Sequence, residues 1–243
     1  MALGFALQPS ALEAFETYYD ILEKRGKTMN LTAIKGVEDV ARLHFLDCIS
    51  LINAYDFHGA RVIDVGSGAG FPGVPLKLSE PSIALTLLDA TRKKVGFLTD
   101  LCDALDIEAQ CVHARAEEAA RKPEHRECFD VAVSRAVARL DILCELCLPF
   151  VCVGGAFLAM KGADSGDEII DAQTSLKLLG AELERIFDYE IPGTEIKHRA
   201  VILRKTSKTP EPYPRRFATI KKSNSQGSSI SLYSGTKQQY HTS

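Results

Sequence analysis

Short apolar segments of strand length alternate with amphipathic segments of helical spacing along most of this chain. The apolar segments predict strands over 61–65, 83–88, 108–113, 129–134, 155–160, 182–190 and 199–205. The amphipathic segments predict helices over 74–79, 92–105, 139–148 and 166–179. Because helices separate most of the earlier strands, those strands are expected to run parallel. The pattern therefore predicts an α/β fold, a doubly wound Rossmann-like sheet that is mostly parallel.

The two ends of the chain depart from this alternation. Residues 10–25 and 36–54 have apolar faces of helical spacing, which predicts an N-terminal helical extension over 1–55. Only a short turn, IPGTEIKH, separates the last two predicted strands, so we expect them to form an antiparallel hairpin at the sheet edge. The sheet domain is assigned to 56–222. Residues 223–243 are rich in Ser, Thr and Gln and are predicted to be a disordered tail.

Composition favours a globular cytoplasmic protein. The 243 residues are 46% apolar, which is enough for a substantial core. No basic region followed by a long apolar segment opens the chain, so we expect neither a signal peptide nor a membrane partner. Seven cysteines, mostly inside apolar segments, indicate reduced thiols. Cys144 and Cys147 have C-x-x-C spacing without a second such pair, which favours core packing over a redox or metal role.

Residues 62–70, VIDVGSGAG, combine a short strand with a glycine-rich turn. Gly66, Gly68 and Gly70 allow the backbone to turn sharply and to approach a ligand with its N–H groups. The dinucleotide pattern is G-x-G-x-x-G, whereas the third glycine here comes one residue earlier. S-adenosylmethionine (SAM) has no pyrophosphate to bind, and its amine suits a nearby acid such as Asp64. The segment therefore predicts a SAM site in preference to a nicotinamide site.

Asp89 ends the second predicted strand. An acid at this position is suited to hold the two hydroxyl groups of a ribose. The alternative is a polar residue that caps the helix beginning near Thr91. Its position one β-α-β unit after the glycine turn favours ribose contact.

Several segments outside the glycine turn carry a family resemblance. They read NLTAI at 30–34, HFLDC at 44–48, VIDVGSGAGFPGVPLKL at 62–78, SRAVA at 134–138, GGAFLAMKG at 154–162 and TPEPYPRR at 209–216. With these segments the chain resembles the RsmG (GidB) family of bacterial 16S rRNA methyltransferases over 10–222. The resemblance implies a SAM-dependent methyltransferase domain that makes 7-methylguanosine in the 530 loop of 16S rRNA.

The resemblance also implies which residues contact SAM. These are Gly66, Phe71, Asp89, Ala90, Thr91, Ala116, Glu117 and Arg135. All follow the carboxyl ends of predicted parallel strands, where open α/β sheets bind ligands. An ordinary helix start remains the alternative for Ala116 and Glu117. A structural salt bridge remains the alternative for Arg135, whose fork suits a carboxylate or a phosphate.

Methylation at guanine N7 requires little acid–base chemistry from the enzyme. This nitrogen carries a lone pair and no proton, so transfer needs alignment of the reactants and no general base. We therefore expect no catalytic base and no metal. His44, Asp47 and Lys161 are candidates to orient the base, with surface or helix-cap polarity as the alternative for each.

Positive charge gathers near the C-terminal end. Between 197 and 222 the only acid is Glu211, and the basic residues are Lys197, Arg199, Arg204, Lys205, Lys208, Arg215, Arg216, Lys221 and Lys222. Such a cluster can neutralise RNA phosphates, and Arg199, Arg215 and Arg216 are predicted to bind the substrate. A solvated basic edge is the alternative.

With the family resemblance, we expect a monomer, and the resemblance implies that it acts on 16S rRNA or the 30S particle. Two other classes stay open. A SAM-binding RNA or ribosome-assembly factor would bind both ligands without catalysis. A nicotinamide-dependent oxidoreductase would need the wider glycine spacing.

Overall fold

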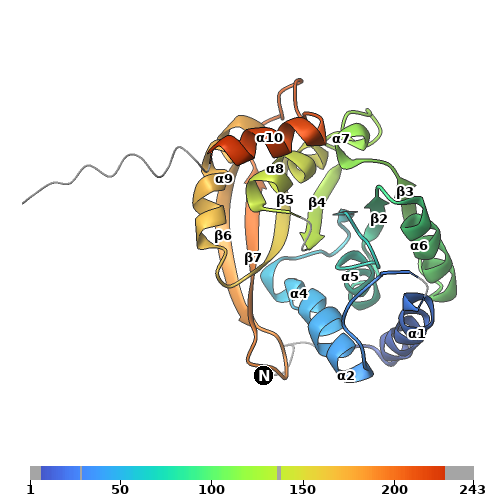
Figure 1. Ribbon diagram of the computed structural model, residues 1–243. Helices are drawn as coiled ribbons and strands as arrows, with labels where there is room; N and C mark the ends of the chain where they lie inside the picture. Colours follow the sequence, from blue (N-terminus) through green and yellow to red (C-terminus); the bar gives the residue numbers. More distant parts are fainter. Residues whose placement is uncertain (1–6, 28, 136–137, 228–243) are drawn as a thin grey trace, which may run out of the picture.

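The computed structural model describes residues 7–27, 29–135 and 138–227. Within them a seven-stranded sheet has the order β3-β2-β1-β4-β5-β7-β6 (Figure 1). Its strands are β1 (Arg61–Val65), β2 (Ala84–Asp89), β3 (Ala109–His113), β4 (Phe129–Arg135), β5 (Val151–Gly162), β6 (Ala181–Glu190) and β7 (Lys197–Lys205). Strands β1 to β5 pair in parallel, and β7 pairs antiparallel with both β5 and β6. The predicted fold class and its edge hairpin are confirmed.

The strand order reverses between β1 and β4. In open α/β sheets, ligands bind at such a reversal, outside the carboxyl ends of the strands. The glycine turn follows β1 and Arg135 ends β4, so both lie at this point. The topology therefore places the candidate site at the carboxyl edge of the sheet.

Two apolar cores lie on opposite faces of the sheet. Side chains alternate along a strand, so Val62 packs into one core and Ile63 into the other. Helices α5 (Gly73–Ser79) and α6 (Arg92–Ala104) cover the first face, and α8 (Leu140–Cys147) and α9 (Gly166–Leu179) cover the second. Cys144 and Cys147 are fully buried in the second core, which confirms their predicted packing role.

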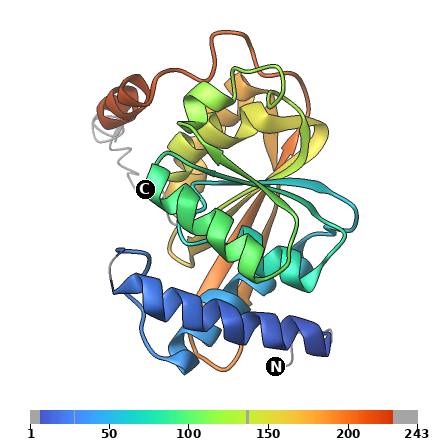
Figure 2. The same cartoon turned by 90° about the vertical axis from the view of Figure 1, so that its right-hand side faces the viewer.

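The N-terminal extension is helical, as predicted. It comprises α1 (Pro9–Gly26), α2 (Val37–Val40), a wide π-helical turn (Ala41–Leu46), α3 (Asp47–Ile49) and α4 (Leu51–Ala54). Helix α1, in blue, lies beside α6, in green (Figure 2), and Arg25 joins Asp100 across this contact. Wide turns of this kind often occur at functional sites, and this one carries His44.

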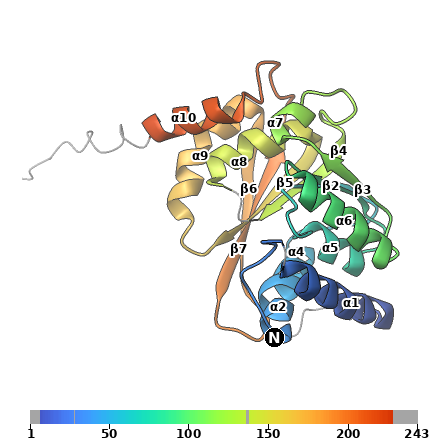
Figure 3. The same cartoon turned by 45° about the vertical axis from the view of Figure 1, so that its right-hand side comes forward.

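Three elements were not among the predicted strands and helices. Helix α7 (Ala116–Ala119) is the helix start that was the alternative for Ala116 and Glu117, and the other two are the 3-10 turn η2 (Leu148–Phe150) and α10 (Phe217–Gly227). Helix α10 lies at the opposite end of the molecule from α1 (Figure 3). It continues past 223, the expected start of the tail, and residues 228–243 lie outside the described residues. Every helix in the described part of the chain is too short or too polar to cross a membrane.

Candidate functional site

The glycine turn forms the centre of the site. Gly66, Gly68 and Gly70 have φ angles of 79°, 60° and 101°, a region that favours glycine. The Gly66 N–H donates to the carbonyl of Leu88 at 2.8 Å, which joins the turn to the end of β2. A Cβ at Gly68 would meet only the Gly66 carbonyl oxygen within 4 Å, at 3.8 Å. The turn therefore has open space on one side, as a ligand-binding loop requires.

Helix α1 supports the turn from behind. The Tyr18 hydroxyl donates to the carbonyl of Ala69 at 2.6 Å, and the Tyr18 ring stacks on Phe71 at 5.4 Å between centroids. A Cβ at Gly70 would lie only 2.6 Å from the Tyr18 hydroxyl oxygen. Glycine at this position therefore permits close contact between the extension and the turn.

Asp64 lies beneath the turn and is fully buried. Its Oδ2 accepts a hydrogen bond from the Gly73 N–H at 2.9 Å. Its Oδ1 has no hydrogen-bond partner among the described residues. Burial raises the pKa of this carboxyl group to about 7. The unpaired oxygen leaves an acceptor for a donor group from outside the protein.

Asp89 connects two loops at the end of β2. Its Oδ2 accepts from the Gly68 N–H at 3.0 Å, and its Oδ1 accepts from the Thr91 N–H at 2.7 Å. The second bond has the character of the alternative capping role, since Thr91 precedes the first residue of α6. The first bond holds the carboxylate against the glycine turn. Asp89 is therefore in the place that ribose contact requires, and that contact stays a prediction.

The other predicted cofactor residues follow β2 and β3 at the same edge. Ala90 and Thr91 come after β2, and Ala116 and Glu117 form the first turn of α7 after β3. The carbonyl of Ala90 lies 3.2 Å from Nε2 of His113, which ends β3. The structure thus brings these two loops together beside the glycine turn.

Arg135 bonds to the extension. Its Nη2 donates to Nδ1 of His44 at 2.9 Å, and its Nη1 donates to the carbonyl of Leu43 at 3.2 Å and to Asp47 Oδ2 at 3.3 Å. The guanidinium also lies over the Phe71 ring, 4.7 Å from its centroid. The salt bridge that was the alternative for Arg135 is therefore present, and it lies directly against the glycine turn.

His44 is held as a neutral imidazole. Because Arg135 donates to Nδ1, the proton lies on Nε2, which donates to Thr32 Oγ1 at 2.6 Å. The ring stacks on Phe71 with centroids 4.5 Å apart. Burial, followed by the Arg135 charge, lowers the His44 pKa to about 4. Its Nδ1 is thus occupied and unavailable to take a proton.

Asp47 accepts hydrogen bonds from several donors of this cluster, and it is 1% exposed. Its Oδ1 accepts from the Tyr189 hydroxyl at 2.7 Å and from His198 Nδ1 at 2.9 Å. Asp47 therefore connects the extension to β4, β6 and β7. We call His44, Asp47, Phe71 and Arg135, with Tyr18, Thr32, Tyr189 and His198, the extension cluster.

Several predicted substrate residues make ion pairs within the protein. Lys161 Nζ contacts Glu168 Oε2 at 2.7 Å, and Arg199 Nε contacts Asp188 Oδ1 at 2.9 Å. Lys205 is fully buried, so its assignment to an RNA-binding basic cluster is wrong. The long apolar strand β7 carries it inward.

Arg215 is also used internally. Its guanidinium forms a two-pronged pair with Glu145, with Nε to Oε1 at 2.9 Å and Nη2 to Oε2 at 2.6 Å. The backbone N–H of Arg215 donates to Oε1 of the same carboxylate at 2.6 Å. Glu145 lies on α8 and is buried. Arg216, by contrast, is exposed.

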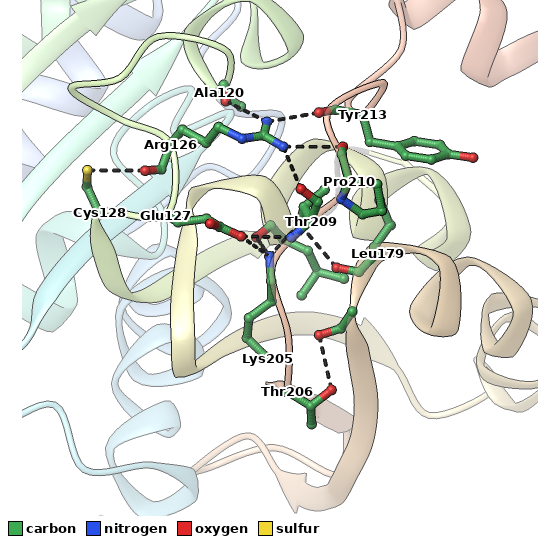
Figure 4. A network of polar contacts seen from close by, with 12 residues as sticks. Ala120, Arg126, Glu127, Cys128, Leu179, Lys205, Thr206, Thr209, Pro210 and Tyr213 are labelled. Atoms are coloured by element: carbon green, nitrogen blue, oxygen red, sulfur yellow. Dashed lines mark hydrogen bonds and ion pairs between the residues drawn. The ribbon is translucent and has the colours of Figure 1, made fainter.

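Residues 209–216, here called the C-terminal strap, are held largely through their backbone (Figure 4). Arg126 donates to the carbonyls of Thr209, Pro210 and Tyr213 at 2.8, 3.3 and 2.9 Å. Lys205 Nζ donates to the Thr209 hydroxyl, and the Thr209 N–H donates to Glu127 Oε1 at 2.8 Å. The strap therefore depends on cations for its attachment.

Four members of the extension cluster have no role predicted from the sequence. Tyr18 belongs to the apolar helical segment 10–25, and Thr32 lies inside the NLTAI segment. Tyr189 and His198 lie in the hairpin strands β6 and β7. His198 ends the predicted turn IPGTEIKH, and a histidine directly before an apolar strand was the available signal for it.

Comparison with known proteins agrees with this geometry. Residues 11–196 match the profile of the family GidB, described as rRNA small subunit methyltransferase G. The chain is 42% identical over 216 residues to ribosomal RNA small subunit methyltransferase G of Pelotomaculum thermopropionicum, covering 88% of this chain and 90% of that protein. The protein of the same description from Clostridium botulinum is 43% identical over 210 residues, covering 86% and 88%.

Solved structures share the fold at low sequence identity. One, from work on the conversion of a disulfide bond into a thioacetal group during echinomycin biosynthesis, has a TM-score of 0.53 at 16% identity and covers 74% of this chain and 86% of its own. Another, TYW2 of M. jannaschii in complex with AdoMet, has a TM-score of 0.50 at 12% identity and covers 63% and 72%. These likenesses support the architecture, and the sequence matches identify the family: the chain belongs to GidB, the rRNA small subunit methyltransferase G family.

Proposed function

We propose that this protein transfers a methyl group from SAM to N7 of a guanine in the 530 loop of 16S rRNA. The family membership and the relatives' descriptions support an rRNA substrate. The observation that carries the proposal is the open glycine turn at the strand-order reversal, with Asp89 bound to it and Asp64 beneath it. In a protein of this kind we expect a cytoplasmic monomer that acts on 16S rRNA or the 30S particle.

The residues at this edge fit SAM. Its ribose hydroxyl groups are donors, and the Asp89 carboxylate has acceptor capacity beyond its two backbone bonds. Its ammonium group suits a buried acceptor, and Asp64 Oδ1 lacks a partner among the described residues. Ala90, Thr91, Ala116 and Glu117 would flank the nucleoside. When bound, SAM supplies an electrophilic methyl group on a sulfonium centre.

The residues of the protein then have to position the reactants, and they need not transfer protons. Guanine N7 has a free lone pair, so alignment of the acceptor with the methyl group suffices. His44 cannot readily serve as a base, because its Nδ1 accepts from Arg135. Arg135 and His44 flank the Phe71 ring and fix the wall of the glycine turn. We assign no catalytic base.

The substrate residues have divided roles in this proposal. Asp47, Lys161 and Arg199 act by positioning the elements around the guanine, and Arg215 holds the C-terminal strap to α8, since each bonds within the protein. His44 belongs to the same group. Arg216 contacts RNA, since it is exposed.

Mass spectrometry of 16S rRNA from cells with and without the gene tests the proposal. We expect one missing methyl group on a 530-loop guanine, restored by the wild-type gene. Gly66→Val should not restore it, because the new side chain would occupy the cofactor's approach. Gly96→Val is a matched control, since a Cβ at Gly96 meets no atom within 4 Å.

Calorimetry and methyl transfer with purified protein separate the remaining alternatives. Binding of SAM and RNA without methyl transfer, on both naked rRNA and 30S particles, would support the assembly-factor alternative. Binding of a nicotinamide cofactor in place of SAM would support the oxidoreductase.

A further inference from the structure

Four exposed cations stand at the starts of three helices beside the proposed cofactor loops. Arg92 and Lys93 open α6, Arg115 precedes α7, and Arg216 precedes α10. We call these four residues the cationic rim. No acidic residue lies in the first turn of α6 or of α10.

At α6 and α10 the rim opposes the ordinary electrostatics of a helix, whereas the first turn of the short α7 holds Glu117 and Glu118. A helix N-terminus carries partial positive charge, so a cation there is unfavourable where an acid would stabilise. None of the four rim side chains forms a salt bridge with any residue that the structure describes. Arg139, the cation before α8, differs because its Nη2 pairs with Asp171 at 2.6 Å. An anion from outside these residues would offset the rim's unfavourable placement.

The rim residues lie on adjoining segments of the fold. Asp89 and His113 are paired across β2 and β3, and the Ala114 N–H donates to the Asp89 carbonyl at 3.3 Å. The segments leading into α6 and α7 therefore run side by side. Arg115 and Arg216 line one hollow of about 750 Å³ between α7 and α10, which adjoin in Figure 1.

The hollow is fixed by a bond across it. Glu117 Oε1 accepts from the N–H of Phe217, the first residue of α10, at 3.3 Å. This bond engages the Glu117 carboxylate, and Glu118 is the other acid in the hollow. Arg121, its third arginine, donates to the carbonyls of Pro212 and Pro214 in the C-terminal strap. The unengaged cations of the hollow are therefore Arg115 and Arg216.

We propose that the cationic rim binds the sugar–phosphate backbone of the substrate RNA. The inference rests on the function proposed above and specifies which surface holds that RNA. Arginine presents a planar fork of donors that matches a phosphate, and each neutralised phosphate releases counterions. Because the rim borders the loops at Asp89 and Ala116, RNA held there lies beside the cofactor loops.

The test removes two rim charges and compares them with two charges elsewhere. The rim variant is Arg115→Gln with Arg216→Gln. The control is Lys24→Gln with Lys177→Gln, two exposed residues on α1 and α9. RNA binding is measured by fluorescence anisotropy with a fragment that contains the 530 loop, over a range of salt concentrations, and by competition with isolated 30S particles.

We expect the rim variant to bind the fragment about tenfold more weakly at about 0.15 M salt. The slope of log affinity against log salt should become shallower by about 1.4, since each single-stranded phosphate contact contributes about 0.7. Affinity for SAM should change by less than about twofold, and the control should behave as wild type. Arg92→Gln with Lys93→Gln provides a second rim variant, should the first fold poorly.

Wild-type RNA affinity and salt slope in both folded rim variants would overturn the inference, as would an equal loss in the control. Failure of the proposed function looks different. In that case the wild-type protein binds RNA without methylating it, and the rim is still judged from the binding curves.

Discussion

Arginine anchors two polar clusters in this protein, the extension cluster and the C-terminal strap, and the partners differ. Arg135 in the extension cluster bonds to His44 and Asp47 and lies over Phe71, directly against the glycine turn. Arg126 at the strap bonds to backbone carbonyls of a segment without regular structure. Both arginines bring together segments far apart in the sequence. Only the first does so at the candidate site.

Charge near a binding site can therefore have two explanations, folding or ligand binding. Most of the strap's carbonyls lie outside a helix or sheet, and Arg121 and Arg126 donate hydrogen bonds to them. A basic residue beside such a segment is therefore explained by folding alone. In the extension cluster the same residue type unites the extension, β4 and the glycine turn, so a change there should affect ligand binding. Four predictions test this contrast.

The largest expected effect is at the strap. Arg126→Ala removes the donors to Thr209, Pro210 and Tyr213, and should lower the free energy of unfolding by about 3 kcal/mol. Urea denaturation measures this loss. Lys122→Ala, an exposed neighbour, is the control and should change stability by less than about 0.5 kcal/mol. Undiminished stability in Arg126→Ala would show that the strap is not held as described.

A pH series tests the extension cluster. The His44 pKa is about 4 in the folded protein against an ordinary 6.5, so the unfolded chain binds more protons between these values. Neutral His44 therefore contributes stability that is present above pH 6.5 and lost as pH falls. Between pH 7 and pH 5 this loss should reach about 2 kcal/mol.

The measurement compares wild type with His44→Gln, because Asp64 acts in the opposite direction. Its pKa is raised to about 7, so its protonation stabilises the folded protein as pH falls. Subtracting the two unfolding curves cancels the Asp64 contribution. The same pH dependence of the unfolding free energy in both proteins would contradict the assignment of His44 as a neutral, buried imidazole.

A neighbouring pair of arginines sharpens the distinction at the strap. Arg215→Ala leaves the buried Glu145 carboxylate without its pair and should cost about 2 kcal/mol of stability, with SAM affinity retained. Arg216→Ala should leave stability within about 0.5 kcal/mol, because this residue is exposed. Thermal denaturation of the two single variants measures this difference in stability. Equal stability of the two variants would contradict the structural role assigned to Arg215.

The smallest expected effect is on the cofactor. Tyr18→Phe removes the hydrogen bond to Ala69 and should weaken SAM binding by about 1 kcal/mol, or about fivefold. The KM for SAM should rise while kcat is retained, because Tyr18 touches the turn and not the reacting atoms. Tyr19→Phe on the same helix is the control. Equal SAM affinity in the two variants would show that this contact of the extension does not support cofactor binding.

Local sequence patterns predicted most of the architecture. The helix expected over 166–179 is α9 (Gly166–Leu179), because strand and helix periodicity, and the Gly180 that follows, act over a few residues. The long strand β5 was underestimated, since its first part includes Gly154 with a φ angle of 89° and a register shift opposite β4. Helix α10 was missed because its composition resembles that of the following tail.

Local sequence is sufficient to specify the alternation of elements, the glycine turn and the acids at the ends of β1 and β2. Each depends on backbone conformation or on spacing within a few residues. Which charges are engaged inside the protein depends instead on the folded structure. Arg135 and Asp47 are 88 residues apart, and Arg215 and Glu145 are 70 apart. A charge's free energy depends on the partners and burial that folding brings to it, and no local pattern records those.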